Sequence, residues 1–160
     1  MKFNATSLLS LSVIAVSTLF FATSCSKSNS SSSSASFTAS LNGAAYQPAT
    51  VQAIDSLGTV GILGFKTADT SALYVEFQDS ARLNVPYDIT GDLAYAEYSK
   101  GLTGFYSSWE YPSHGAITIT SLDKTNKKVS GRFSGVIYAS GSSDSLVIVN
   151  GQFNSTFQSR

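Results

Sequence analysis

Apolar residues recur at every second position through most of the chain beyond residue 36, and this alternation restricts the possible fold more than any other feature. It is clearest in residues 128–139, where Val129, Phe133 and Ile137 share one side of an extended segment with two glycines. Successive side chains of a β-strand point to opposite faces, so the pattern predicts strands with one apolar and one mixed face. Because no segment sustains an amphipathic helical period for three turns, we expect an all-β domain with little helix.

Turn residues separate these segments at intervals of about eight to twelve residues, as in sandwiches and barrels. Asn42 and Gly43 suit a tight hairpin turn that leads to Tyr46, and Pro86, which lacks a backbone donor, favours an edge strand. Three long segments predict a meander: residues 116–122, 128–139 and 146–153. We expect an antiparallel β-sandwich or a closed β-barrel of about nine to eleven strands, and periodicity does not choose between them.

The first twenty-five residues have the layout of an export signal. Lys2 precedes residues 8–21, a stretch of fourteen residues with ten apolar members and no charge. This stretch is shorter than the roughly 20 apolar residues that cross a membrane as a helix, so it predicts a cleaved signal peptide over residues 1–24. Small residues then lead to Cys25, as in the bacterial lipobox, although Ala22 stands where leucine is usual.

We therefore expect lipid on Cys25, with two alternatives: a general signal peptide that leaves a free thiol, or an uncleaved anchor. A diacylglycerol thioether would hold the protein firmly, since each buried methylene contributes about 0.8 kcal/mol. Ser26, in place of an aspartate, is typical of lipoproteins sent to the outer membrane. The sequence does not determine on which face of that membrane the protein lies. Serine occupies eight of the eleven positions in residues 26–36, so residues 25–36 predict a spacer ahead of a domain over residues 37–160.

Composition restricts the classes of partner and cofactor that we expect. Charged residues make up 12% of the chain, with ten acidic and ten basic side chains, so no long-range field attracts nucleic acid. The single cysteine excludes an intramolecular disulfide, and one histidine is too few for a typical zinc site. Asp88, Asp92, Asp123 and Asp144 lie at predicted turns, without the spacing of a calcium-binding loop. We expect no metal, no cofactor and no nucleic-acid partner.

The layout resembles a family of uncharacterised lipoproteins from Bacteroidetes-type bacteria. The likeness consists of the lipobox, the serine-rich spacer and a β domain that opens with a strand-Asn-Gly-strand unit. Its most recognisable segments are residues 37–47 (FTASLNGAAYQ), 115–138 (GAITITSLDKTNKKVSGRFSGVIY) and 147–154 (VIVNGQFN). The resemblance implies a single all-β domain and a location in the envelope, and it carries no activity or functional residues with it.

Residues 105–111 (FYSSWEY) hold four aromatic side chains in seven positions. We expect Phe105, Trp109 and Tyr111 to close one end of the β core as a plug. The alternative is an exposed platform of Tyr106, Trp109 and Tyr111, because tyrosine and tryptophan give binding surfaces contact area at low entropic cost.

These patterns favour a non-enzymatic envelope module that is anchored in the membrane by lipid. It would bind a glycan, peptide or protein partner, or contribute to the surface coat. One alternative is a lipocalin-like barrel that carries a small apolar ligand. The third is a hydrolase built around His114, which lacks an accompanying nucleophile motif and has the least support.

Overall fold

A computed structural model describes residues 35–101 and 104–160, and the predictions for Cys25 and residues 1–34 lie outside this part. The described residues form twelve strands and no helix, so none of them supplies a helical membrane span. The strands are β1 (Ser36–Leu41), β2 (Ala44–Tyr46), β3 (Thr50–Ser56), β4 (Thr59–Lys66), β5 (Ser71–Gln78), β6 (Pro86–Asp88), β7 (Ala94–Lys100), β8 (Gly104–Ser107), β9 (His114–Asp123), β10 (Lys128–Ala139), β11 (Ser145–Thr156) and β12 (Gln158–Ser159).

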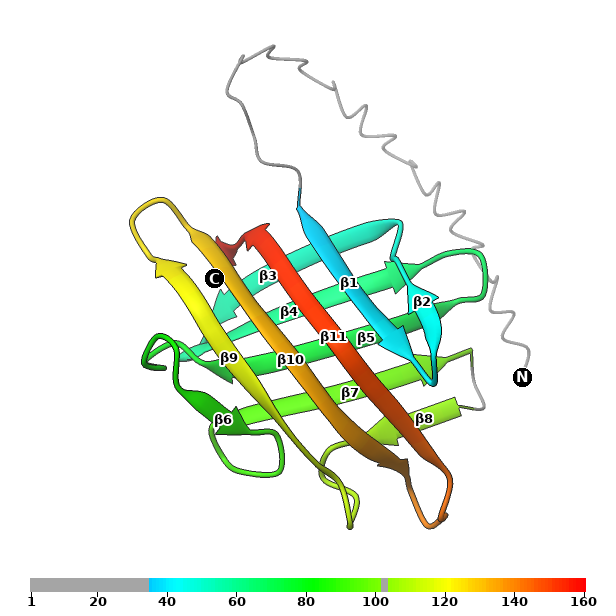
Figure 1. Ribbon diagram of the computed structural model, residues 1–160. Coiled ribbons are helices and arrows are strands. Elements are labelled where there is room, and N and C mark those ends of the chain that lie inside the picture. Colours follow the sequence, from blue (N-terminus) through cyan, green and yellow to red (C-terminus); the bar gives the residue numbers. More distant parts are fainter. Residues whose placement is uncertain (1–34, 102–103) are drawn as a thin grey trace, which may run out of the picture. The chain divides into compact units, whose positions relative to one another are not determined.

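All twelve strands belong to one hydrogen-bonded sheet, and the all-β prediction is confirmed. The main path runs β12-β3-β4-β5-β7-β8-β10-β11-β1-β2, while β9 pairs with β10 and β6 pairs with β9. Figure 1 shows this sheet folded over itself, so that β9, β10, β11 and β1 cross over β3, β4, β5 and β7. The two outer faces of the folded sheet are therefore separate surfaces.

The sheet is open, and the expectation of a closed barrel is wrong. The two ends of its path, β12 and β2, do not pair with each other. Strand β8 pairs with only the last two residues of β10, whereas β9 pairs with the earlier part of the same edge of β10. The sheet therefore branches there. A lipocalin-like carrier therefore lacks the closed wall on which it depends.

Two further details differ from the expectation. The pairing of β12 with β3 is parallel, so the sheet is mixed rather than wholly antiparallel. The strands also outnumber the expected nine to eleven, because the structure includes the short strands β2, β6, β8 and β12, which sequence periodicity resolves poorly. Strand β6 pairs with β9 alone among the described strands, which confirms the edge position predicted from Pro86.

The apolar alternation faces the interior between the crossing halves of the sheet. In β10, Val129, Phe133 and Ile137 are all buried, as the sequence predicts. Phe153 of β11 stacks on Phe133 within its own half, with ring centroids 6.3 Å apart. It also stacks on Phe77 of β5 in the other half, at 6.2 Å. The predicted meander of β9, β10 and β11 is thus joined to the other half by aromatic packing.

Two glycines make room for this packing. Gly131 of β10 pairs with Phe153 of β11, and Phe133 of β10 pairs with Gly151 of β11. A Cβ atom at Gly131 would lie 2.3 Å from the Phe153 ring, and one at Gly151 would lie 2.6 Å from the Phe133 ring. Each phenylalanine ring therefore covers the glycine opposite, which explains glycines in the middle of buried strands.

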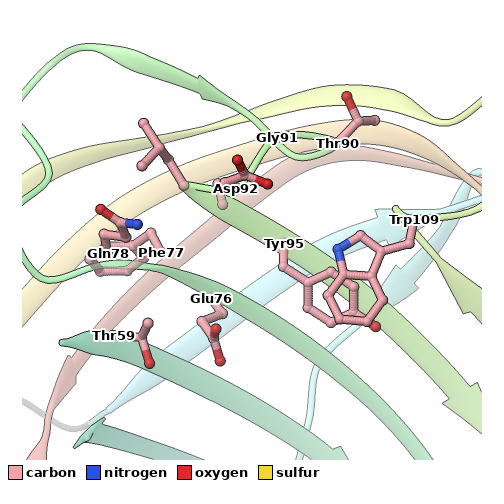
Figure 2. Close-up of a pocket in the computed structure, with 11 residues that line it drawn as sticks. Thr59, Glu76, Phe77, Gln78, Thr90, Gly91, Asp92, Tyr95 and Trp109 are labelled. Atoms are coloured by element: carbon pink, nitrogen blue, oxygen red, sulfur yellow. The ribbon is translucent and has the colours of Figure 1, made fainter. Parts of the chain in front are cut away.

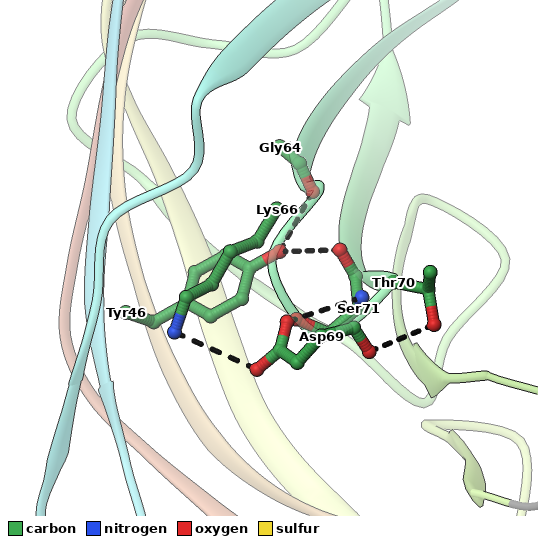
Figure 3. A network of polar contacts seen from close by, with 6 residues as sticks. All are labelled: Tyr46, Gly64, Lys66, Asp69, Thr70 and Ser71. Atoms are coloured by element: carbon green, nitrogen blue, oxygen red, sulfur yellow. Dashed lines mark hydrogen bonds and ion pairs between the residues drawn. The ribbon is translucent and has the colours of Figure 1, made fainter.

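The first hairpin is held to the other half of the sheet by Tyr46. Asn42 and Gly43 both have positive φ, at 48° and 83°, as the predicted tight turn requires. The turn brings Tyr46 back into the core, where its hydroxyl donates to the carbonyl of Gly64 at 2.8 Å and lies 3.2 Å from that of Ser71 (Figure 3). Burial raises the pKa of Tyr46 to about 12, so the phenol stays a donor.

Candidate functional site

The outer face of β5 and β7 carries two tyrosines and two glutamates in alternation. Across the strands, Tyr74 pairs with Glu97, and Glu76 pairs with Tyr95. Along the strands, the Tyr74 hydroxyl donates to Glu76, and the Tyr95 hydroxyl donates to Glu97 at 2.6 Å. The two phenol rings meet edge to face, with centroids 6.4 Å apart. Neighbouring hydrogen bonds and packing thus fix all four side chains.

The two phenols of this face stay neutral at ordinary pH. Burial, followed by the hydrogen bond to Glu97, raises the pKa of Tyr95 to about 12. The same two causes, with Glu76 as the acceptor, raise the pKa of Tyr74 well above its usual value. Because the phenols keep their protons, each continues to donate to a carboxylate, and each carboxylate keeps acceptor capacity for a ligand.

Trp109 extends this face with a large exposed ring. The indole lies against the Tyr95 phenol, with centroids 4.6 Å apart and the planes at 43°. Even so, 76% of Trp109 is exposed. A side chain of this size contributes little to stability when it is so exposed, which makes its ordered position a candidate functional feature.

Three serines hold the loop that carries Trp109. The Ser107 hydroxyl accepts the Trp109 backbone N–H at 3.1 Å. Buried Ser108 pairs with Ala96 of β7 twice: its N–H donates to the Ala96 carbonyl at 2.9 Å, and its hydroxyl accepts the Ala96 N–H at 3.1 Å. The Ser113 hydroxyl donates to the Ser107 carbonyl at 3.0 Å. The loop therefore has a defined path without a helix or a strand of its own.

A pocket of about 340 Å³ opens beside Trp109. Figure 2 shows the rings of Trp109 and Tyr95 on one side of it, with Thr59, Glu76 and Gln78 across from them. Buried Phe77 contributes an apolar part of the lining. The pocket thus combines an aromatic side with a polar side, as ligand sites commonly do.

The segment between β6 and β7 forms another wall of the pocket. Thr90 donates its backbone N–H, at 2.9 Å, and its hydroxyl, at 2.8 Å, to the carboxylate of Asp88. These bonds hold the pKa of Asp88 below its usual range. Gly91 donates to the Asp88 carbonyl at 3.2 Å, and this turn places Asp92 in the pocket lining. The wall is therefore ordered by local hydrogen bonds.

The pocket is acidic. Among the described residues, Glu76 and Asp92 line it and no lysine, arginine or histidine does. Within the same part of the chain, the ion pairs join Lys66 to Asp69 and Lys124 to Asp79, so neither pocket carboxylate has a cationic partner. The local field consequently disfavours an anionic ligand.

The structure separates the three aromatic residues predicted as a platform. Trp109 lines the pocket, whereas Tyr111 is 94% exposed and does not. Tyr106 pairs with buried Tyr98 on the core side of β8, and its hydroxyl donates to Asp144 at 2.6 Å. The predicted platform therefore groups side chains that lie in different surroundings.

The expectation of an aromatic plug is wrong. Trp109 and Tyr111 are mostly exposed, and Phe105 is 48% exposed. The physical reason lies in the serines of the same segment: Ser107 and Ser108 are 3% and 1% exposed, and they fill the buried positions by hydrogen bonding to their surroundings. Phe105, Trp109 and Tyr111 are consequently left outside the core.

His114 begins β9 at an exposed position. Its Nδ1 atom lies 3.2 Å from the carbonyl oxygen of Pro112, and this is the hydrogen-bond contact of its ring within the described residues. His114 does not line the pocket beside Trp109. In the same described part of the chain, no three His, Cys, Asp or Glu side chains gather as a metal site would require.

The sequence patterns did not identify the polar side of the pocket as part of a site. Alternation places Glu76 and Gln78 on the face opposite the core, and an aromatic cluster marks Trp109. Nothing local indicates that Asp92 and Thr59 would join them. The pairing of β4 with β5 sets Thr59 opposite Gln78, and the packing of the segment between β6 and β7 brings Asp92 to the pocket. Both are tertiary features.

Comparison with known proteins gives one match. A family model described as a domain of unknown function, DUF6252, matches residues 33–156. No curated protein matches the chain, and no solved structure matches it.

Proposed function

The chain belongs to the DUF6252 family, and we propose that it is a lipid-anchored envelope protein whose β domain binds a ligand without transforming it. The observation that carries this proposal is the ordered yet 76% exposed Trp109 at the rim of a pocket. Binding surfaces favour such residues, because a rigid aromatic ring gives a large contact area at little entropic cost.

The order of the pocket supports a binding role. The serine contacts fix the loop of Trp109, the Asp88 turn fixes the facing wall, and strand pairing fixes Glu76 and Tyr95. A ligand that enters a site formed in advance does not bear the full cost of ordering it.

The chemistry of the lining favours binding over catalysis. The titratable groups that line the pocket are Glu76, Asp92 and Tyr95, and Tyr95 already donates its proton to Glu97. The Thr90 hydroxyl donates to the carboxylate of Asp88, whose lowered pKa makes it a weak base. Nucleophilic catalysis requires a nucleophile beside a base strong enough to take its proton, and these contacts supply no such pair.

The anchor would be a lipid on Cys25, and the destination the outer membrane. Ten residues separate Cys25 from the start of β1 at Ser36. At about 3.3–3.6 Å per residue, the eleven steps from Cys25 to Ser36 span no more than about 40 Å when fully extended. The β domain would therefore work within a short distance of the membrane.

We also propose that the folded sheet is best classed as a β-sandwich. Its support is the contact between halves: Phe77 of β5 stacks on Phe153 of β11, and Tyr46 of β2 packs on Tyr98 of β7. Two layers with a shared apolar interior are the defining feature of a sandwich.

Two experiments test this function. Mass spectrometry of the membrane-extracted protein should find a diacylglycerol thioether on Cys25, and Cys25→Ser should release the protein from membranes. An unmodified Cys25 would overturn the anchor.

For the pocket, glycan, peptide and protein fractions of the envelope are titrated against the detergent-solubilised chain while Trp109 fluorescence is followed. One fraction should give a saturable change, and Glu76→Gln should weaken it. Arg132→Ala, on the exposed outer face of β10, is the control that should leave it intact. No change with any fraction would overturn the binding role.

A further inference from the structure

We propose that the pocket beside Trp109 binds an uncharged saccharide, a proposal that rests on the binding function inferred above. The pocket combines an exposed aromatic ring with a facing polar wall and lacks basic groups. Each of these three properties restricts the chemistry of the occupant, and together they match a sugar ring.

The aromatic side suits the apolar face of a pyranose. One face of a sugar ring presents mainly C–H groups, which pack on an aromatic ring much as aliphatic side chains do. Trp109 keeps 76% of its surface available, while its contact with Tyr95 holds the indole in place. The indole thus offers a fixed, open platform at the mouth of the pocket.

The polar side suits hydroxyl groups. Figure 2 shows Thr59, Glu76 and Gln78 on the side of the pocket away from the aromatic rings, with Asp92 on a third side. Hydroxyl, amide and carboxylate groups together accept and donate hydrogen bonds. The Tyr74 hydroxyl donates to Oε2 of Glu76, which leaves Oε1 as an acceptor. Sugar hydroxyls require such a mixture of partners.

Charge decides between neutral and acidic sugars. Carboxylated, sulfated and phosphorylated ligands are usually bound by arginine or lysine. Of the described residues, none that lines this pocket is basic, whereas Glu76 and Asp92 are both acidic. An anionic ligand would meet repulsion here, and an uncharged saccharide would not.

Size limits the occupant to a short saccharide or to the end of a longer chain. The volume of about 340 Å³ lies near the lower limit of small-molecule sites, which range over about 300–1,000 Å³. The pocket opens to the surface beside an exposed loop, so further sugar units can extend into solvent. We therefore expect the terminal or penultimate units of a glycan to make the contacts.

The test uses the fact that Trp109 is the only tryptophan in the chain, so protein fluorescence excited at the indole band reports on this site alone. The detergent-solubilised protein is titrated with maltotetraose, cellotetraose, mannotetraose and chitotetraose, and with tetragalacturonate as the anionic tetrasaccharide of matched length. We expect a saturable blue shift and protection from acrylamide quenching with at least one neutral tetrasaccharide. Tetragalacturonate should bind at least tenfold more weakly.

Variants assign the effect to the pocket. Glu76→Gln keeps the size of the side chain and should weaken the affinity for the neutral saccharide by about tenfold. Arg132→Ala should leave that affinity unchanged. No response to any neutral tetrasaccharide, or equal binding of tetragalacturonate, would overturn the saccharide proposal. If an envelope peptide or protein fraction still shifts Trp109 emission, the binding function stands and only the ligand class is wrong.

Discussion

The indole of Trp109 packs on the phenol of Tyr95, with ring centroids 4.6 Å apart. Tyr95 belongs to β7, and Trp109 lies in the loop that follows β8. The contact therefore fixes this loop against β7. The hydroxyl of Tyr95 accepts from Ser107 at 3.3 Å and donates to Glu97 at 2.6 Å. One phenol thus connects the exposed indole to the acidic face of the sheet.

Ser108→Ala should loosen the Trp109 loop. The substitution removes the hydroxyl that accepts the Ala96 N–H and leaves a buried donor unpaired, at a cost of about 1–3 kcal/mol in the free energy of unfolding. Chemical denaturation measures this cost, and the fluorescence anisotropy of Trp109 should fall. Ser80→Ala, at an exposed turn, should change neither quantity. Unchanged anisotropy in Ser108→Ala would show that other contacts hold the loop.

Tyr46→Phe should destabilise the fold by about 1 kcal/mol. The change keeps the ring in the core and removes the hydroxyl that donates to the Gly64 carbonyl at 2.8 Å. Equilibrium unfolding in urea gives the free energy. The control is Tyr111→Phe, because Tyr111 is 94% exposed and should contribute nothing measurable. Equal stabilities for the two variants would contradict the bridging role of Tyr46.

Stability should fall between about pH 10 and pH 12. Tyr46 and Tyr95 have pKa values raised from 10.0 to about 12 in the folded protein, chiefly by burial. The unfolded chain therefore releases these protons first as the pH rises. The contribution of the two protonated phenols to the free energy of unfolding is complete below pH 10 and is lost as the pH passes through about 12.

Unfolding curves across this range, with the tyrosinate absorbance recorded in parallel, measure the effect. The double variant Tyr46→Phe/Tyr95→Phe should show a shallower loss of stability over the same range. An identical slope in the double variant and the natural chain would show that neither phenol is responsible.

Gly131→Ala should destabilise the core by about 1–3 kcal/mol. The added methyl group would lie 2.3 Å from the ring of Phe153 and 2.8 Å from the carbonyl oxygen of Thr118, which is backbone and cannot turn away. The matched control is Gly104→Ala, whose nearest contact would be an ordinary 3.5 Å. Thermal unfolding of both variants decides the matter, and a similar midpoint for the two would contradict the packing described for β10 and β11.

The apolar alternation made the strands predictable. It determines which side chains are buried in β5 and β10, and Asn42 with Gly43 determines the first hairpin, because both signals act over a few residues. The way the open sheet folds over itself depends on β8 meeting the end of β10, a contact between segments about thirty residues apart. No local sequence pattern predicts such a pairing, so the sequence alone could not distinguish a sandwich from a barrel.

The candidate site was only partly predictable for the same reason. The aromatic segment stands out in the sequence, but local composition did not reveal that Ser107 and Ser108 occupy the buried positions while Trp109 is exposed. Glu76 and Asp92 come from separate segments and meet at the pocket only through the fold. A hydrophobic side chain is normally expected inside, and here the hydrogen bonds of two small polar residues override that expectation.

The most direct test of the account is the affinity of Trp109→Ala, measured by calorimetry, for whichever ligand shifts Trp109 fluorescence in the natural chain. Loss of the indole removes most of the aromatic side of the pocket, so binding should weaken at least tenfold, or about 1.4 kcal/mol. The free energy of unfolding should change little, because 76% of the side chain is exposed. Unchanged affinity in a folded Trp109→Ala variant would contradict the assignment of this pocket as the binding site.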